Sequence, residues 1–344
     1  MKTFKNIELK NSPKISLVLP CYNSEEFIEE TLLSIKNQDY KNIELVIVDG
    51  GSTDNTCVII EKYSDLYTRF ISESDNGQTD AINKGINFCT GDIFYWINAD
   101  DFIEKNVLLE VAEEFIKDPF DVLCVRNRNF ENGTNRTLQY SKTTFYSTIE
   151  ETIPYAAMSI TVFYNLKKAK TLFPLSESLH YAMDFELYFG FLLKFDLTRA
   201  RYSTIPIVTN FRVHPDSKTI QQEQSVGYTD LNAIHLSILK QLNAPIKLIN
   251  YYEKLGFNKF YNKKWDLSAI NSNLLYGYYA KRLALFEYSK QEYKNSKELI
   301  LIAYKSKAVF EIYDWYRFIV LYFMPESILK LILRVKKKNG KSVY

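Results

Sequence analysis

The sequence predicts an α/β protein with a mostly parallel sheet flanked by helices, followed by a helical C-terminal region. In the first 125 residues, short apolar segments of strand length alternate with segments of helical periodicity. Strands and helices that alternate at this spacing form βαβ units, which place the strands side by side and parallel. After about residue 230, glycine is scarce and apolar residues recur every three or four positions. We therefore expect two domains, residues 1–230 and residues 231–344.

Each expected strand is a short apolar segment that leads into a polar or turn-forming stretch. The first, residues 15–20, is closed by Pro20. The second, residues 43–50, is rich in β-branched residues and runs into the glycine turn GGSTDNT. Three further segments complete the expected sheet, namely residues 69–72, 92–101 and 120–125.

Helical periodicity fills the intervals between these strands. Ser24 can cap the first helix, whose apolar positions from Phe27 to Ile35 keep helical spacing, and the glycine turn opens the second. The pattern weakens between residues 130 and 180. The remaining expected elements are helices at residues 77–88, 104–117 and 183–195 and a strand at residues 202–214.

The composition excludes several classes of protein. The chain has 344 residues, with 46% hydrophobic and 24% charged, as in folded soluble proteins. A net charge of +2 is too small to indicate a nucleic-acid binder. The four cysteines lack metal-binding spacing and are expected to be reduced. Neither a secretory signal nor an apolar run of membrane-spanning length is present, so we expect a cytoplasmic protein.

The end of the sequence has two interpretations. Residues 315–341 contain two apolar blocks separated by Pro325, and a basic cluster follows at Lys336, Lys337 and Lys338. An amphipathic segment that ends in basic residues can lie at the inner face of an anionic membrane. Alternatively, the segment is a pair of core-packing helices with a solvated basic tail.

Polar residues follow three of the expected strands at the point where each strand ends. These clusters are Cys21 to Asn23, Asp49 to Ser52, and Asn98 to Asp101. Ligands of open α/β sheets bind beyond the carboxyl ends of parallel strands. We therefore expect the three clusters to meet in one crevice.

Asp100 and Asp101 pose an electrostatic problem, because two adjacent carboxylates at the end of a buried strand repel each other. A divalent cation such as Mg²⁺ or Mn²⁺ would offset this repulsion and bridge the phosphates of a ligand. The alternative is that the pair caps the next helix. Asp49 has two readings as well: it accepts hydrogen bonds from its own glycine turn, or it contacts a nucleobase or ribose.

Residues 16–56 and 75–101 together resemble the family 2 glycosyltransferases of the GT-A fold, among them bacterial polysaccharide and O-antigen enzymes. The resemblance covers roughly residues 14 to 216. It implies a nucleotide-sugar pocket whose first wall holds Pro20, Tyr22 and Asn23. It also implies that Asp49 contacts the base. The segment that would close over the nucleotide contains Gly77, Asp80, Asn83 and Lys84.

The DXD motif of this family corresponds here to Asn98, Ala99 and Asp100, followed by Asp101. Asn98 departs from the family pattern, because a neutral amide hydrogen-bonds a ribose hydroxyl but is a poor Mn²⁺ ligand. The resemblance therefore implies that Asp100 is the principal ligand of Mn²⁺ or Mg²⁺. Asp101 would support that ligand or contact the donor sugar. Ile82 also departs from the family, since many relatives have an arginine there.

The family also places a catalytic carboxylate at a helix start beyond the acceptor loops. Asp184 fits this position as the general base, with Glu186 as its rival; two residues apart on a helix, they face different sides. In the segment FRVHPDSKT, Arg212 would pair with phosphate oxygens and His214 would ligate the metal.

The resemblance implies an inverting transfer of a sugar from a nucleotide diphosphate donor, with UDP as the expected nucleotide. The acceptor would be a hydroxyl of a glycan or lipid-linked oligosaccharide in cell-surface polysaccharide synthesis. A nucleotidyltransferase is disfavoured, because PCYNSEEF after the first strand contains no glycine and no basic residue. A non-catalytic nucleotide-sugar-binding or scaffolding protein is the alternative that Asn98 and Ile82 favour.

Overall fold

The structure is a computed structural model that describes residues 12–156, 161–203, 205–206, 209–215, 217 and 224–324. The chain divides into two compact units. Unit 1 comprises Met1–Thr144, Ala156–Ile234 and Gly256–Asp266, and unit 2 comprises Phe145–Tyr155, His235–Leu255 and Leu267–Tyr344. Because the chain passes between the units more than once, the predicted domains 1–230 and 231–344 stay a prediction.

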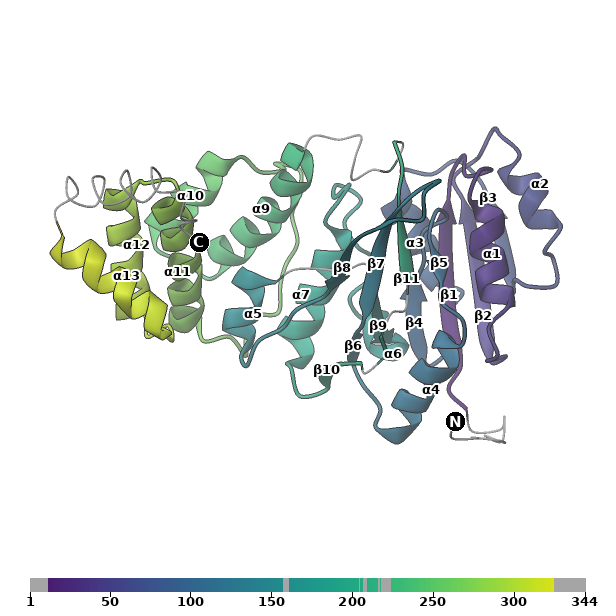
Figure 1. The fold of residues 1–344 in the computed structure, drawn as a ribbon, viewed down its shortest axis with the longest axis horizontal. Coiled ribbons are helices and arrows are strands. Elements are labelled where there is room, and N and C mark those ends of the chain that lie inside the picture. The colour runs from purple at the N-terminus through teal and green to yellow at the C-terminus, as the bar shows by residue number, and fades with distance from the viewer. Residues whose placement is uncertain are drawn as a thin grey trace. The chain divides into compact units, whose positions relative to one another are not determined.

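Unit 1 is built on a mostly parallel sheet, which confirms the expected fold class (Figure 1). Within the described residues the sheet has seven strands in the order β10-β6-β9-β4-β1-β2-β3. Only β9 among these runs antiparallel to its neighbours, β4 and β6. The strands are β1 (Ile15–Cys21), β2 (Ile43–Asp49), β3 (Arg69–Ser72), β4 (Ile93–Trp96), β6 (Val122–Cys124), β9 (Val162–Asn165) and β10 (Ala200–Tyr202).

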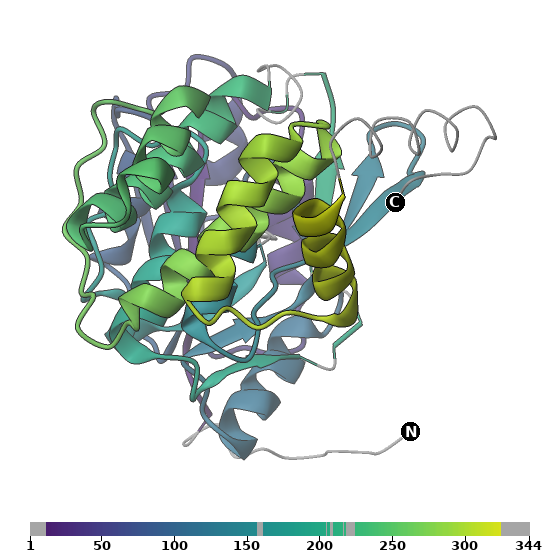
Figure 2. The same ribbon diagram turned by 90° about the vertical axis from the view of Figure 1, so that its left-hand side faces the viewer.

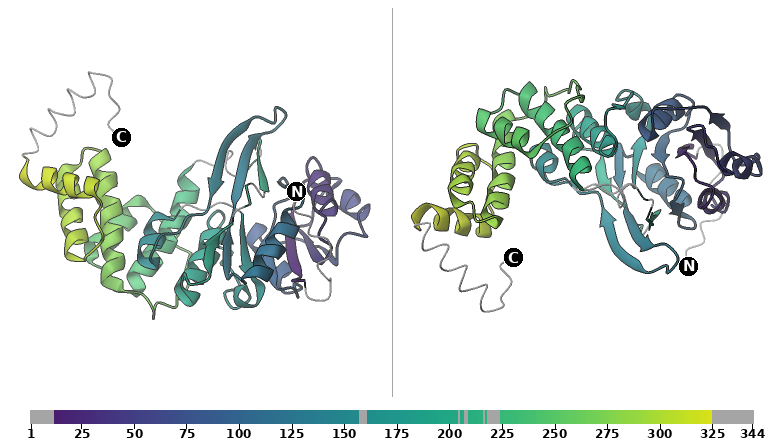
Figure 3. Two further views of the ribbon diagram at one scale, coloured as in Figure 1. Left: turned by 60° about the horizontal axis from the view of Figure 1, so that its bottom comes forward. Right: turned by 90° about the horizontal axis from the view of Figure 1, so that it is seen from above.

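A second sheet in unit 1 was not expected from the sequence. In the part of the chain that the structure describes it has four strands, in the order β5-β11-β7-β8. Both views of Figure 3 show β7 and β8 as a projecting hairpin. The expected strand at 202–214 is therefore wrong as a single element, because it contributes to both sheets. The strands of the second sheet are β5 (Phe102–Ile103), β7 (Arg126–Glu131), β8 (Thr137–Lys142) and β11 (Thr209–Val213).

The helices of unit 1 lie where helical periodicity predicted them, except α6, which was not expected. They are α1 (Ile28–Lys36), α2 (Thr56–Glu61), α3 (Gln78–Ile86), α4 (Val107–Lys117), α6 (Leu166–Ala169) and α7 (Met183–Phe195). The expected cap is wrong in detail, because Ser24 is not the N-cap of α1. Phe27 takes that position without a side-chain hydrogen bond, and the Ser24 hydroxyl donates to the carbonyl of Tyr22 at 3.1 Å.

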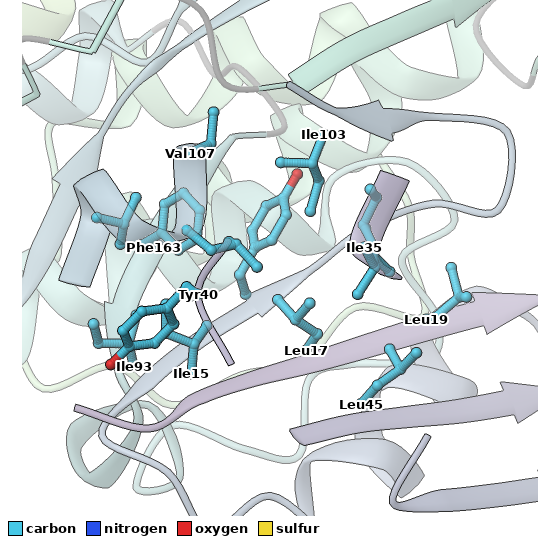
Figure 4. Packing of buried hydrophobic residues seen from close by; sticks show 14 of the residues in the cluster. Ile15, Leu17, Leu19, Ile35, Tyr40, Leu45, Ile93, Ile103, Val107 and Phe163 are labelled. Carbon is cyan, nitrogen blue, oxygen red and sulfur yellow. The ribbon is translucent and has the colours of Figure 1, made fainter. Parts of the chain in front are cut away.

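Alternation along β1 assigns its side chains to two faces of the sheet. Ile15, Leu17 and Leu19 belong to the core cluster that α1 and α4 complete, and Figure 4 labels Ile35 of α1 and Val107 of α4 in the same cluster. The opposite face is covered by α3, whose Gly85 lies directly against Val18. Because helices cover both faces of the sheet, the ends of the parallel strands are the part of the sheet that stays accessible.

Unit 2 is helical, which confirms the expected helical C-terminal region. Figure 2 shows α11, α12 and α13 packed in succession, coloured from green to yellow. Among the described residues we find no helix that is both long and apolar enough to cross a membrane. Pro325 and Lys336 to Lys338 lie outside the described residues. The helices are α5 (Ile149–Tyr155), α10 (Ile246–Leu255), α11 (Ser272–Ser289), α12 (Tyr293–Lys305) and α13 (Ile312–Phe323), and α9 (Gln224–Gln241) begins in unit 1.

Candidate active site

A cleft of about 850 Å³ opens in unit 1 beyond the carboxyl ends of β1, β2 and β4. Its lining includes Cys21 to Asn23, Gly50, and Asn98 to Asp100. Each of the three polar clusters that were expected to converge therefore contributes to one cavity. Parallel pairing explains the convergence, because the register aligns Cys21 with Asp49 and Val18 with Trp96.

Asp100 and His214 face each other at this cleft. The imidazole Nε2 of His214 lies 3.1 Å from Oδ2 of Asp100. The ring of His214 packs against the ring of Phe27, with centroids 4.6 Å apart, so its orientation is fixed by packing as well. The His214 side chain is 8% exposed and that of Asp100 is 28% exposed, so the pair is largely shielded while the carboxylate still reaches solvent.

Asp101 turns away from the cleft and organises the loop that carries Asp100. Its carboxylate accepts hydrogen bonds from the backbone N–H of Arg212 at 2.9 Å and from the amide of Asn98 at 3.0 Å. Burial, with a smaller contribution from the Asp100 carboxylate, raises the pKa of Asp101 well above its usual range. The Asn98 oxygen accepts from the side chain of Gln78 at 2.7 Å. The sugar and ribose contacts expected of Asp101 and Asn98 stay predictions.

The Arg212 side chain lies behind the same loop and does not line the cleft. Its Nε donates to the carbonyl oxygen of Asp100 and its Nη1 donates to Asn132, both at 2.9 Å. Its Nη2 forms an ion pair with Glu30, and the guanidinium lies over the ring of Phe27. Arg212 therefore fixes the loop that presents Asp100, and its predicted contact with phosphate stays a prediction.

The donors at this loop fit a divalent cation. A carboxylate oxygen and an imidazole nitrogen that converge on one cavity suit Mn²⁺, and Mg²⁺ accepts the carboxylate. Within the described residues, no group of three or more His, Cys, Asp or Glu side chains is arranged to hold a metal ion. Asp100 and His214 would therefore leave most coordination positions to phosphate oxygens and water.

Of the two rival carboxylates on α7, only Asp184 lines the cleft. Its Oδ1 accepts from the backbone N–H of Phe185 at 2.8 Å, and burial raises its pKa to about 6. The Glu186 side chain is fully buried, forms an ion pair with Lys263 and accepts from the N–H of Ser176 at 3.1 Å. Of these two carboxylates, Asp184 is therefore the one that faces the cleft.

Pro20, Tyr22 and Asn23 form one wall of the cleft. The Tyr22 ring is 60% exposed and offers a flat surface to a base. Asp49, by contrast, is fully buried and does not line the cleft. Its Oδ2 accepts from the N–H of Ser52 at 3.0 Å. Burial alone would raise the pKa of Asp49, but hydrogen bonds from Ser52 of its turn and from Ser72 of β3 lower it. The structure therefore shows the turn contacts, and the contact with a base stays a prediction.

The residues expected to close over the nucleotide divide into two groups. Gly77 lines the cleft and has φ of +105°, a conformation that favours glycine. Asp80 and Lys84 form an ion pair at 3.2 Å on the surface of α3. The Asn83 amide exchanges hydrogen bonds with the backbone of Leu175, at 2.9 and 2.8 Å. These three do not line the cleft, and their predicted contacts with the nucleotide stay predictions.

Sequence reasoning missed part of the cleft near Asp184. His180 and Tyr181 line the cavity, and the buried carboxylate of Asp230 holds both by accepting their backbone N–H groups at 2.7 and 3.0 Å. Their position in HYAMDFE, directly before Asp184, was the available signal. The other residues of the lining that were not anticipated include Asp54, Asp75, Gln78, Trp96, Met183 and Phe211.

Comparison with known proteins connects this geometry to a family. The model of glycosyl transferase family 2 matches residues 16–173. A glycosyltransferase of Haemophilus influenzae is 38% identical over 101 residues, which cover 28% of this chain and 40% of that protein. Chondroitin synthase of Escherichia coli is 26% identical over 267 residues, which cover 74% of this chain and 38% of that protein. The chain thus spans about two fifths of the length of these curated relatives.

Among solved structures, S. aureus TarS 1–349 in complex with UDP-GlcNAc superposes with a TM-score of 0.55 at 20% identity. The match covers 96% of this chain and 93% of TarS 1–349. The chain therefore has a GT-A-like fold, as TarS 1–349 does. The family model thus covers a little under half of this chain, and the structural similarity to TarS 1–349 extends over nearly all of it.

Proposed function

We propose that this protein transfers a sugar from a nucleotide diphosphate donor, a UDP-sugar, to a hydroxyl group of a glycan or lipid-linked oligosaccharide. One observation carries the proposal: the Asp100–His214 pair and the Asp184 carboxylate line the same cleft. A site for the leaving diphosphate and a base for the attacking hydroxyl are thereby brought within one cavity. That combination is what a single displacement at an anomeric carbon needs.

Asp184 acts as the general base in this proposal. Its carboxylate takes the proton of the acceptor hydroxyl as that oxygen forms a bond to the anomeric carbon. The bond from the anomeric carbon to the phosphate oxygen breaks on the opposite side, and the nucleoside diphosphate leaves. Because the reaction is one in-line displacement, the configuration at the anomeric carbon inverts. A pKa of about 6 leaves Asp184 mostly ionised at neutral pH, as a base requires.

The leaving diphosphate needs its charge neutralised, and Asp100 and His214 are the residues that would hold a divalent cation for this purpose. When bound, such an ion supplies electrostatic stabilisation of the leaving group. Arg212 contributes by holding the Asp100 loop through its bond to the Asp100 carbonyl oxygen. The exposed Tyr22 ring is the proposed stacking surface for the uracil base.

The printed names of relatives support the donor and the pathway class. The TarS structure contains UDP-GlcNAc. Relatives include chondroitin synthase and the poly-beta-1,6-N-acetyl-D-glucosamine synthase of Staphylococcus epidermidis, which is 29% identical over 134 residues. We therefore place the proposed reaction in the synthesis of a cell-surface polysaccharide.

The test combines binding with turnover. Thermal unfolding is measured with UDP-, GDP- and TDP-sugars, with and without Mn²⁺, because a ligand that binds the folded state raises Tm by mass action. Release of UDP is then followed for the native chain, Asp184→Asn and the control Asp65→Asn, whose carboxylate is 68% exposed. We expect stabilisation by UDP-sugars with Mn²⁺ and turnover that only Asp184→Asn abolishes. Binding without any turnover would instead favour a non-catalytic nucleotide-sugar-binding protein.

A further inference from the structure

Helix α13 presents an apolar stripe to solvent. Ile312, Tyr316, Ile319 and Phe323 follow one another at intervals of four, three and four residues, which places them on one face of the helix. Their exposed fractions are 79%, 61%, 52% and 74%. These four residues are called the α13 stripe. A surface helix of a globular protein ordinarily turns such a stripe toward the core.

The opposite side of α13 packs on the rest of unit 2, and it buries Asp314, Val320 and Leu321. Asp314 is buried and forms an ion pair with Lys281 of α11 at 2.7 Å, with both side chains at most 10% exposed. Asp314 also accepts from the N–H of Glu311 at 3.0 Å and so completes a capping box. Rotating the helix to bury the stripe would break this shielded ion pair, which leaves an uncompensated buried charge. The outward orientation of the stripe is therefore fixed by the packing of Asp314.

Aromatic residues with polar tips border the stripe on both sides. Tyr313, Trp315 and Tyr322 are 72%, 41% and 47% exposed. Tyrosine and tryptophan combine an apolar ring with a hydrogen-bonding group, so they concentrate where an apolar phase meets water. The border of the stripe thus has the chemistry of an interface rather than of a dry core.

We propose that the α13 stripe docks on an anionic membrane surface. The sequence that follows the helix, residues 325–344, contains six basic residues and one acidic residue, which complements anionic headgroups. The 12 residues of α13 extend about 18 Å, well short of the ~30 Å hydrocarbon core, so the helix lies in the interface and does not span it. A second copy of the chain is a poorer occupant, because it would bring two strongly basic segments together. This inference goes beyond the proposed sugar transfer and does not depend on it.

The test is flotation of the full chain with liposomes of phosphatidylcholine alone or of phosphatidylcholine with 30% phosphatidylglycerol. The stripe variant replaces all four residues of the α13 stripe with serine, and its fold is checked by circular dichroism. The control is Phe260→Ser, which removes an 88% exposed ring from unit 1. We expect binding to the anionic liposomes that the stripe variant weakens by roughly tenfold or more and the control leaves unchanged.

A second variant, with Lys336, Lys337 and Lys338 replaced by glutamine, tests the charge separately. Each lysine removed should weaken binding roughly fivefold at low salt and less at high salt. The proposal is overturned if the stripe variant floats as well as the native chain. It is equally overturned if the native chain binds neither kind of liposome and the stripe variant has a different sedimentation coefficient from the native chain. The stripe would then bind a second copy of the chain. Neither measurement needs a sugar donor. Failure of the membrane proposal can therefore be distinguished from failure of the proposed sugar transfer.

Discussion

His214 and Asp100 are 114 residues apart in the sequence, and the imidazole Nε2 lies 3.1 Å from the carboxylate Oδ2. The second sheet produces this contact. Antiparallel pairing aligns Asn210 of β11 with Phe102 of β5, so that continuing the register brings the residues after Asn210 level with the Asp100 loop. The pairing of the short strands β5 and β11 thus places His214 beside the loop that follows β4, a strand of the other sheet.

Removing either member of this pair should weaken metal-dependent donor binding. Asp100→Asn and His214→Ala should each raise the Mn²⁺ concentration that half-saturates UDP-sugar binding, by roughly tenfold or more. If both side chains hold one ion, the double variant loses little more than either single variant. Calorimetric titration of UDP-sugar at several Mn²⁺ concentrations measures this, with Asp65→Asn as the control. Additive losses in the double variant would show that the two residues act on different ligands.

The activity of the native chain should fall in acid because of Asp184. Burial raises the pKa of this carboxyl to about 6, and only the ionised form accepts a proton from the acceptor. The value of kcat/KM should therefore fall about tenfold for each pH unit below 6. Asp184→Asn should lose roughly 10²- to 10⁴-fold in rate at neutral pH, as expected on removal of a general base. A full pH–rate profile is the measurement, and a rate that stays flat from pH 7 to pH 4.5 would exclude Asp184 as the base.

The same carboxyl should cost stability at neutral pH. Because the pKa of Asp184 is higher in the folded state than its ordinary value, the folded chain holds the proton more tightly than the unfolded chain. Its stabilising contribution is present below pH 4 and is lost as the pH rises through about 6. Asp184→Asn should thus be more stable than the native chain at pH 8, by about 3 kcal/mol at most. Urea unfolding at pH 8 and pH 4 tests this: the difference should shrink at pH 4, and a variant that is less stable at pH 8 contradicts the assignment.

Breaking the ion pair between Glu186 and Lys263 should strongly lower the free energy of unfolding of unit 1. The Glu186 side chain is 0% exposed and that of Lys263 is 19% exposed, so removing one partner leaves a shielded charge without compensation. Lys263→Met should destabilise the chain by about 3–5 kcal/mol, and adding Glu186→Gln should restore part of the loss. Urea unfolding compares these variants with Lys36→Met. That control breaks the surface pair with Asp65, whose two side chains are 43% and 68% exposed, and should cost less than about 1 kcal/mol. Equal costs for the two lysine variants would refute the distinction.

Close packing of α3 on the sheet should not tolerate a side chain at Gly85. A Cβ at this position would lie 2.6 Å from Cγ1 of Val18, well inside contact distance. Gly85→Ala should therefore cost about 1–3 kcal/mol, despite the better helix propensity of alanine. The matched control is Gly227→Ala in α9, where the nearest atom would be Cβ of Tyr181 at 3.7 Å and a gain of up to about 1 kcal/mol is expected. Thermal unfolding of both variants gives the comparison, and a stabilised Gly85→Ala would show that α3 moves freely on the sheet.

Local sequence pattern was sufficient for the main sheet and for the three polar clusters. Apolar segments of strand length gave β1, β2 and β3 nearly to the residue, and parallel pairing then required their ends to meet. The pattern failed where a strand is polar. The segments RNRNFE and TLQYSK form β7 and β8 without a continuous apolar face, and most of β8 is exposed. Likewise, the sequence pattern predicted one strand at 92–101, whereas β4 ends at Trp96 and a loop follows.

The sequence by itself determined the fold class, the crevice at the strand ends and the identity of the candidate carboxylates. Period and spacing are local properties, and they suffice to place a residue on a strand end or in the first turn of a helix. Only the tertiary structure decided which carboxylates face the cleft. Asp100 and Asp184 line the cleft, whereas Asp49, Asp101 and Glu186 are held by partners inside the protein. Where a side chain points depends on partners such as Arg212 and Lys263. These partners come from distant segments of the chain, and local sequence patterns do not predict which distant segments pair.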